Sequence, residues 1–440
     1  MPRRKEMNDL YEEKWRALKS EIDGRTQGGE ELFLAIKDYY EVYDGRLPYW
    51  LGSLYNAEIG GFHYSLSSRD NEEVTTDRGT FKLLPDIESS FQALSILSSS
   101  GMMKDFSELP EKMREGLKSF VCSLQDKDTG FIIHPQWREL MADVEGKSGN
   151  ADIMWKARRG RDMMWAEGIC ERLGFSLPYP TAYERLMCES EGEKTAASSD
   201  LPDYLLSRER LINYLDSLNW ETDAYYAGNM VASQGRLFLA AGLADIAADY
   251  LTEKQNKESG LWGSVGGYAA INAYLKITGM YNELKLPIPN AHRAAESVIA
   301  CATTEERAAT VCYQYNVWYS VRNILNSLRS YGGTEGEEQA REITRKLLVT
   351  APAAIRKTKE KLLTFKKADG SFSYYPHGTA DHSQGMPVAI KGSNEGDLNA
   401  SVICTTGITG NIFETLGLRE FMIPLFGEGA FDKFKIAAKM

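Results

Sequence analysis

The chain of 440 residues has few features of membrane proteins, oxidised proteins or nucleic-acid-binding proteins. No stretch approaches about 18 uninterrupted apolar residues, so the sequence predicts no membrane span. Its six cysteines are scattered and none has CxxC spacing, which predicts reduced thiols and no tight zinc or redox site. Lys and Arg number 51 against 62 Asp and Glu, and this net charge of -11 argues against a phosphate backbone as partner.

Other signatures are missing as well. The phosphate-binding patterns GxGxxG and GxxxxGK[ST] do not occur, which argues against nucleotide chemistry. The N-terminus, MPRRKEMNDLYEEKW, is basic but has no apolar core, so we expect no secretory signal. Together with the scattered thiols, this predicts a cytoplasmic protein.

Alternating β-branched runs are rare, whereas apolar residues at helical spacing recur from about residue 30 to the C-terminus. The sequence therefore predicts an all-α protein, with an N-terminal extension at 1–29 and a single domain at 30–440. The polar, Ser-rich stretch 188–202 is the best linker or exposed loop, and a two-domain helical protein is the alternative.

A turn that combines glycine with an aromatic residue returns along the chain. It is found at Gly60–Ser65, Thr129–Trp137, Ser259–Ser264 and Asp369–Pro376, each time after a polar stretch. Glycine just past a helix is the usual left-handed cap, so each turn marks the end of a helix and a short extended segment.

Two kinds of helix alternate between these turns. Six are rich in small and apolar residues, and they begin near Pro85, Arg161, Gly228, Val265, Tyr315 and Asp397. The others are charged and amphipathic, as at Glu111, Ser207 and Glu337. A helix that is apolar all round must be buried, while one with a charged face can meet water. The alternation predicts six inner and six outer helices, closed as an (α/α)6 toroid.

The glycine-aromatic turns resemble the QW-type repeats of the terpenoid cyclase and protein prenyltransferase toroids, over about residues 30 to 420. The same hairpin barrel is shared by six-hairpin glycosidases and several polysaccharide lyases. This resemblance implies an architecture and leaves the activity open, because one fold hosts many functions.

In such a toroid, residues near the starts of the inner helices would surround one mouth of the central cavity. Those positions combine carboxylates, aromatics, amides and arginines, which suits a sugar because aromatic faces take C–H surfaces and polar groups take hydroxyls. The expected substrate-binding residues are His63, Tyr64, Trp137, Arg161, Asp162, Tyr225, Tyr226, Asn229, Tyr375, His377 and Asn394.

Four carboxylates are the candidate catalytic residues. Asp86 and Glu88 lie in LLPDIESS, and Glu395 and Asp397 end a long polar loop, 377–401, that leads into the last inner helix. Glycoside hydrolysis needs one protonated and one ionised carboxyl group, and the first and last inner helices would be neighbours in a closed ring. The competing interpretation is that Asp86, Glu88 and Asp397 cap or begin their helices.

Three other functions stay open: a lyase, a terpenoid cyclase and a non-catalytic toroid that binds a ligand. A lyase would use a Tyr or His base such as Tyr64 or His63, with Arg161 or Asn229 neutralising a uronate. A cyclase would need an aspartate-rich motif, which PDIESS matches loosely. A prenyltransferase is disfavoured, because it would need Asp, Cys and His zinc ligands, which we do not find.

We therefore expect a glycoside hydrolase that acts on imported, uronate-containing or neutral oligosaccharides, without a cofactor or a transition metal. A Ca²⁺ ion held by oxygen ligands would leave little trace in the sequence. The sequence does not define the oligomeric state.

Overall fold

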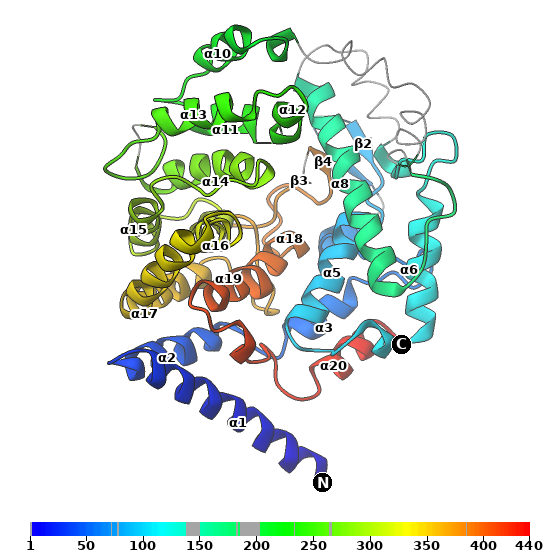
Figure 1. Ribbon diagram of the computed structural model, residues 1–440. Coiled ribbons are helices and arrows are strands. Elements are labelled where there is room, and N and C mark those ends of the chain that lie inside the picture. Colours follow the sequence, from blue (N-terminus) through cyan, green and yellow to red (C-terminus); the bar gives the residue numbers. More distant parts are fainter. Residues whose placement is uncertain are drawn as a thin grey trace.

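The computed structural model describes residues 2–71, 73–76, 79–137, 150–181, 184, 203–232, 234–263, 266–383 and 385–440. Most of these residues are helical, which confirms the all-α class (Figure 1). The predicted linker 188–202 lies outside the described residues. Within the described part, no helix is both long enough and apolar enough to cross a membrane.

The helices predicted to be inner contain many buried residues, although those of the short helix at 224–231 form a single stripe. They are α5 (Ile87–Ser99), α8 (Asn150–Leu173), α11 (Ala224–Val231) with α12 (Gly235–Ala240), α14 (Gly267–Glu283), α16 (Cys312–Tyr331), and α18 (Leu398–Val402) continued by α19 (Ile408–Thr415). Neighbouring members pack together: α8 on α5, α5 on α18, α19 on α16, α16 on α14, and α14 on α11.

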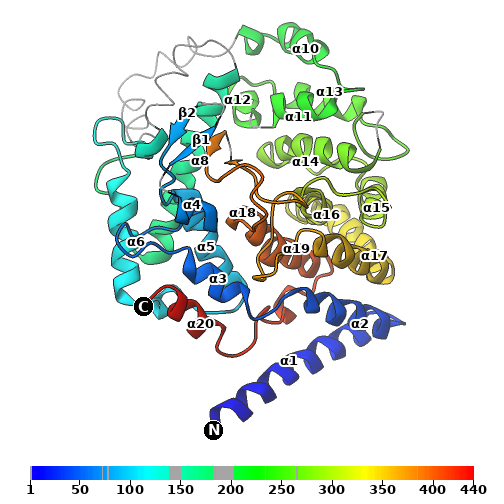
Figure 2. The ribbon, with the colours of Figure 1, turned by 180° about the vertical axis from the view of Figure 1, so that it is seen from behind.

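The other helices of the series carry charged side chains, except for the first, whose sequence LPYWLGS has none. They are α3 (Leu47–Ser53), α6 (Glu111–Ser123), α10 (Arg208–Asp216), α13 (Ala244–Lys254), α15 (Ala291–Ala302) and α17 (Gly333–Leu363). In α6 the buried residues are Met113, Leu117, Phe120 and Val121, which form a single stripe at helical spacing. Both ribbon views place α15 and α17 outside α14 and α16 (Figures 1 and 2).

Further elements cover the ends and the periphery of this arrangement. Helix α1 (Pro2–Arg25) packs on α2 (Gly29–Tyr39) and extends away from the rest of the molecule (Figure 2). The remaining elements are α4 (Leu66–Asp70), α20 (Ala430–Ala437), the short helices η1 (Tyr40–Val42), η2 (Phe106–Glu108), η3 (Asp203–Leu205) and η5 (Arg419–Phe421), and the strand pairs β1 (Val74–Thr76) with β2 (Gly79–Phe81) and β3 (His382–Ser383) with β4 (Met386–Pro387).

The repeated turns share one local structure. In the turn after α3, the side-chain oxygen of Asn56 accepts hydrogen bonds from the backbone N–H groups of Glu58 and Ile59, and Gly60 has a φ of 91°. Asn256 makes the same two bonds before Gly260, whose φ is 71°. The side-chain carbonyl thus fixes a turn that a left-handed glycine completes.

Each of these glycines also lies against another outer helix. A Cβ atom at Gly60 would come within 2.1 Å of the backbone oxygen of Gly116 in α6, and one at Gly260 would come within 2.4 Å of the backbone nitrogen of Ala294 in α15. Gly370 makes the corresponding approach to the backbone nitrogen of Leu47 in α3. The last turn therefore lies against the first outer helix, so the two ends of the repeat series are in contact.

Three local expectations from the sequence need correction. Helix α8 begins at Asn150, so Arg161 and Asp162 lie in its middle rather than at its start. The predicted structureless loop 377–401 contains the β3–β4 hairpin. The last inner helix is interrupted by η4 (Ile403–Gly407), a π-helical turn between α18 and α19. Such features depend on contacts between distant segments, which local sequence patterns do not reveal.

The close approach of Gly260 gives a stability test. Gly260→Ala combines left-handed strain with a clash against backbone, and we expect it to cost about 3 kcal/mol of unfolding free energy. The control is Gly242→Ala, because Gly242 has a φ of 67° but no atom within 4 Å of its added Cβ, and strain alone should cost about 1 kcal/mol. Urea unfolding of both variants measures the difference. Equal losses would show that the contact with α15 does not matter.

Candidate functional site

Asp86 is the N-cap of α5. Its carboxylate accepts hydrogen bonds from the backbone N–H of Ser89 at 2.9 Å and from the Ser89 hydroxyl at 2.6 Å. The residue is buried, and burial together with the charge of Glu88 raises the pKa of Asp86 to about 6. The geometry fits the capping interpretation of this carboxylate and also gives it a perturbed pKa.

Asp397 has the same role at α18. Its carboxylate accepts hydrogen bonds from the backbone N–H groups of Ala400 at 2.7 Å and Tyr374 at 2.9 Å, and from the Thr379 hydroxyl at 3.1 Å. Although these bonds favour the charged form, complete burial raises the pKa of Asp397 to about 6. Asp397 is thus a buried acid that is protonated over part of the physiological pH range.

Glu88 is held by a buried arginine. Arg158 Nη1 lies 2.8 Å from Glu88 Oε2, while the Ser383 hydroxyl donates to Glu88 Oε1 at 2.8 Å. Arg158 Nε also lies 2.8 Å from Asp162 Oδ1, one helical turn further along α8. The side chains of this ion-pair triad are almost completely buried. Burial raises the pKa of Asp162 to about 7 despite the arginine, since two other carboxylates lie nearby.

These carboxyl groups form one cluster. Tyr64 is buried between them, and burial and the negative charges of Asp397, Glu88 and Asp86 raise the pKa of its phenol well above the ordinary value. The backbone explains the proximity, because Phe62 forms an isolated bridge with Asp86 and Ser65 forms one with Asp397. A single extended segment therefore aligns the starts of α5 and α18.

The β3–β4 hairpin covers this cluster. The Ser383 carbonyl accepts a hydrogen bond from Arg158 Nη1 at 3.2 Å, and the Pro387 carbonyl accepts one from Trp137 Nε1 at 3.3 Å. Trp137 is buried, and its ring centroid lies 4.3 Å from the guanidinium carbon of Arg158. Trp137, one of the predicted substrate-binding residues, thus contacts both Arg158 and the β3–β4 hairpin.

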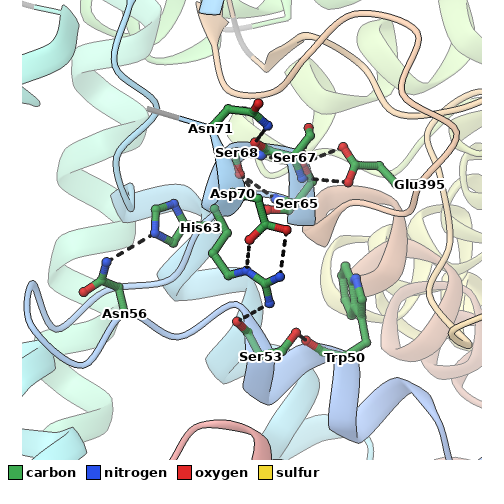
Figure 3. Close-up of polar contacts among 11 residues, drawn as sticks. Trp50, Ser53, Asn56, His63, Ser65, Ser67, Ser68, Asp70, Asn71 and Glu395 are labelled. Carbon is green, nitrogen blue, oxygen red and sulfur yellow. Dashed lines mark hydrogen bonds and ion pairs between the residues drawn. The ribbon is translucent and has the colours of Figure 1, made fainter. Parts of the chain in front are cut away.

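Glu395 and His63 make separate contacts, Glu395 with serines and His63 with Asn56 (Figure 3). Glu395 accepts hydrogen bonds from the Ser65 hydroxyl at 3.0 Å and the Ser67 backbone N–H at 2.8 Å, at the start of α4. His63 Nε2 lies 3.4 Å from the side-chain nitrogen of Asn56, and burial lowers its pKa to about 4. His63 is therefore a neutral, buried imidazole at ordinary pH.

The other predicted residues occupy more open positions. Tyr225 and Tyr226 in the first turn of α11 are about half exposed, and Asn229 follows in the next turn. Arg161 is partly buried, which lowers its pKa, and both Glu88 and Tyr225 act on it electrostatically. Arg161 thus lies between the carboxylate cluster and the tyrosines of α11.

Tyr375 and His377 line a pocket of about 1090 Å³, one wall of which is formed by the loop 375–392. Asn394 is exposed, and its side-chain oxygen accepts a hydrogen bond from Lys367 at 2.8 Å. The predicted residues are therefore divided between the buried cluster, the α11 face, this pocket, and separate contacts made by His63, Asn394 and Glu395.

Sequence reasoning missed the hydrogen bonds that join amides of neighbouring inner helices. The Asn316 amide nitrogen donates to the Asn272 side-chain oxygen at 2.7 Å, joining α16 to α14, and Asn326 donates to Glu414 at 3.1 Å, joining α16 to α19. Asn272, Lys276 and Gly279 are partly exposed at helical spacing, a pattern visible in the sequence as a polar stripe on an apolar helix. Hydroxyl-rich ligands suit such a surface.

The same geometry does not define a metal centre. In the part of the chain that the structure describes, no group of three or more His, Cys, Asp or Glu side chains is arranged to hold an ion. The carboxylates of the cluster instead use serine, backbone and arginine donors.

Comparisons of the chain with protein-family models, curated proteins and solved structures gave no match. The toroid resemblance therefore rests on the repeated turns and helix pattern alone, and any function must be argued from the site.

The raised pKa of Asp397 gives a pH-dependent prediction. Its folded pKa lies above the unfolded value, so wild-type stability from this group falls as pH rises from about 4 to above 6. Asn can still cap the helix but does not ionise. Unfolding free energies at pH 4.5 and 7.5 should show Asp397→Asn gaining about 2 kcal/mol relative to wild type at the higher pH.

Asp105 supplies a control with the opposite shift. It caps η2 at the surface, and its hydrogen bonds to Ser107 lower its pKa. Its contribution to stability changes only below about pH 4, so the difference between Asp105→Asn and wild type should stay constant between pH 4.5 and 7.5. If Asp397→Asn shows no pH-dependent gain, Asp397 is not a perturbed buried acid.

Proposed function

We propose that the protein is a carbohydrate-active enzyme, a glycoside hydrolase that acts on oligosaccharides with Asp397 as the acid and Glu88 as its ionised partner. The observation that supports this most directly is the buried cluster itself. It combines a carboxyl group whose pKa is raised to about 6 with a carboxylate paired to Arg158, on two helices that pack together. Hydrolysis of a glycosidic bond uses such a pair.

The proposal includes the (α/α)6 toroid. The packing of inner helices from α8 through α5, α18, α19, α16 and α14 to α11 supports it, as does the approach of the last turn, at Gly370, to the first outer helix, α3. It also includes a cytoplasmic location and imported substrates. The cysteines described by the structure are all free thiols, which fits a reducing compartment.

Asp397 and Glu88 have separate proposed roles in the reaction. Asp397 would protonate the leaving oxygen, because burial raises its pKa to about 6 and so keeps a fraction of the molecules protonated near neutral pH. Glu88 would act as base or nucleophile, held in place by Arg158 and by Gln92, whose amide nitrogen contacts both Glu88 at 3.1 Å and Asn399 at 3.2 Å. Since Ser383 occupies one oxygen of Glu88, the β3–β4 hairpin must move before substrate reaches it.

The inner faces would bind the sugar rings. Tyr225 and Tyr226 present half-exposed aromatic faces, Asn229 and the amides of α14 and α16 offer donors and acceptors, and Arg161 offers a cation. A hydrocarbon substrate would be matched by fewer polar groups, which makes a cyclase the weaker proposal.

A lyase is the second candidate, and one observation favours it. His382 Nδ1 lies 3.2 Å from Asp381 Oδ1, while its Nε2 is buried and has no hydrogen-bond partner in the described part of the chain. A carboxylate that orients an imidazole leaves the other nitrogen available as a base. Abstraction of a proton next to a uronate carboxylate would use this group.

One assay separates the two reactions. The full-length protein is incubated with neutral and uronate-containing oligosaccharides while reducing ends and ultraviolet absorbance are followed together. Reducing ends without new absorbance support the hydrolase, and absorbance of an unsaturated product supports the lyase. No product from a broad panel would overturn both and favour a binding protein.

Variants of the proposed pair test the roles. We expect Glu88→Gln and Asp397→Asn each to lower kcat at least about 100-fold, since each removes one proton-transfer partner. The control is Glu342→Gln, an exposed residue on α17 paired with Lys346, which should retain wild-type kcat. Circular dichroism confirms folding. Wild-type turnover in both cluster variants would remove these carboxylates from the mechanism.

A further inference from the structure

The pocket of about 1090 Å³ lies beside the proposed catalytic cluster. Its walls come from residues 305–309 after α15, from the last turns of α17, and from the loop 375–392 that includes the β3–β4 hairpin. Thr379 lines it, and the hydroxyl of Thr379 is the group that donates to Asp397 at 3.1 Å. Thr379 therefore separates a molecule in this pocket from Asp397, the proposed acid.

A buried lysine lines the same pocket. Lys361 is 7% exposed, and Nζ donates to the hydroxyl of Tyr268 at 2.5 Å. No carboxylate of the described residues lies within ion-pair distance of Nζ. Burial lowers the pKa of Lys361, as expected for an ammonium group that lacks a counter-ion. An ammonium group has three donors, so two remain for a ligand.

Most acidic side chains around the pocket already have partners. Glu305 and Glu360 pair with Lys357 at 2.9 and 3.0 Å, and Asp381 lies 3.2 Å from His382. Glu306 accepts a hydrogen bond from the Tyr268 backbone N–H at 3.3 Å.

Two further cations line the pocket. Arg307 and Lys391 are exposed, and neither forms an ion pair with a described residue. With Lys357 and Lys361 they balance the four carboxylates of the lining in formal charge, but Arg307, Lys361 and Lys391 form no ion pair with a described residue, so the carboxylate of a ligand would give Lys361 a counter-ion.

We propose that this pocket binds the carboxylate of a uronic-acid residue, with Lys361 as the buried cation that receives it. The sugar ring would lie against the exposed ring of Tyr375, and Arg307 and Lys391 would contribute at the rim. This inference rests on the proposed function in that it takes the ligand to be part of an oligosaccharide. It makes the preferred substrate an acidic glycan whose charged residue lies next to the bond that Asp397 protonates.

Binding without turnover tests the assignment. Isothermal titration calorimetry of the full chain with glucuronic acid, glucose and inorganic phosphate should show glucuronic acid binding at least tenfold more tightly than glucose. Lys361→Met keeps the length of the stem and removes the charge, and it should weaken glucuronic acid binding at least tenfold. Lys346→Met, on the outer part of α17 and paired with Glu342, should bind like wild type.

A second measurement needs no variant. Lysines of the wild-type protein are acylated with acetic anhydride and mapped by mass spectrometry, and glucuronic acid should slow the modification of Lys361 but not of Lys346. Equal binding of glucose, unchanged binding by Lys361→Met, or phosphate binding without glucuronic acid binding would each overturn the inference.

The outcome also separates this inference from the proposed function. Hydrolysis of neutral oligosaccharides without glucuronic acid binding would overturn the inference and retain the hydrolase. Lys361-dependent binding of glucuronic acid without turnover of any oligosaccharide would retain the site and overturn the hydrolase.

Discussion

The central constraint in this protein is the alignment of two helix starts by one extended segment. Phe62 bridges to Asp86 and Ser65 bridges to Asp397, and the Leu398 backbone N–H donates to the Tyr64 carbonyl at 3.0 Å. Because both helices begin with an aspartate cap, this alignment gathers negative charge in the interior. Burial of unpaired charge is costly, so the surrounding backbone donors, the serine hydroxyls and Arg158 are the partners that this arrangement requires.

The buried triad of Glu88, Arg158 and Asp162 is a costly way to stabilise a fold. Such a triad is often no better than well-packed apolar side chains of the same volume, because desolvation offsets the attraction. The β3–β4 hairpin adds more buried polar contacts, since Ser383 donates to Glu88 and the Pro387 carbonyl accepts from Trp137. Clusters of buried polar groups of this kind are typical of functional sites, and for this reason we propose that the cluster is the site of catalysis.

The sequence predicted the parts that depend on local structure. The left-handed glycines, the capping aspartates and the single apolar stripe of α6 follow from residues close in the chain. It did not predict the partners of Glu88, because Arg158 comes from the middle of a helix whose start has no local signal. The Asn272–Asn316 pair and the β3–β4 hairpin were missed for the same reason, since each joins or covers segments far apart in sequence.

The π-helical turn Ile403–Gly407 has a consequence for the last inner helix. A π turn carries one residue more than an α turn would, and such turns are frequent near functional sites. Because the widened turn takes up this residue, deleting it would give an uninterrupted α-helix with nearly the same phase before and after the turn. Asp397 would then stay beside Tyr64, whereas a deletion within α18 would rotate Asp397 by about 100° around the axis. The widened turn thus lets the helix carry one more residue without turning its acidic start away from the extended segment.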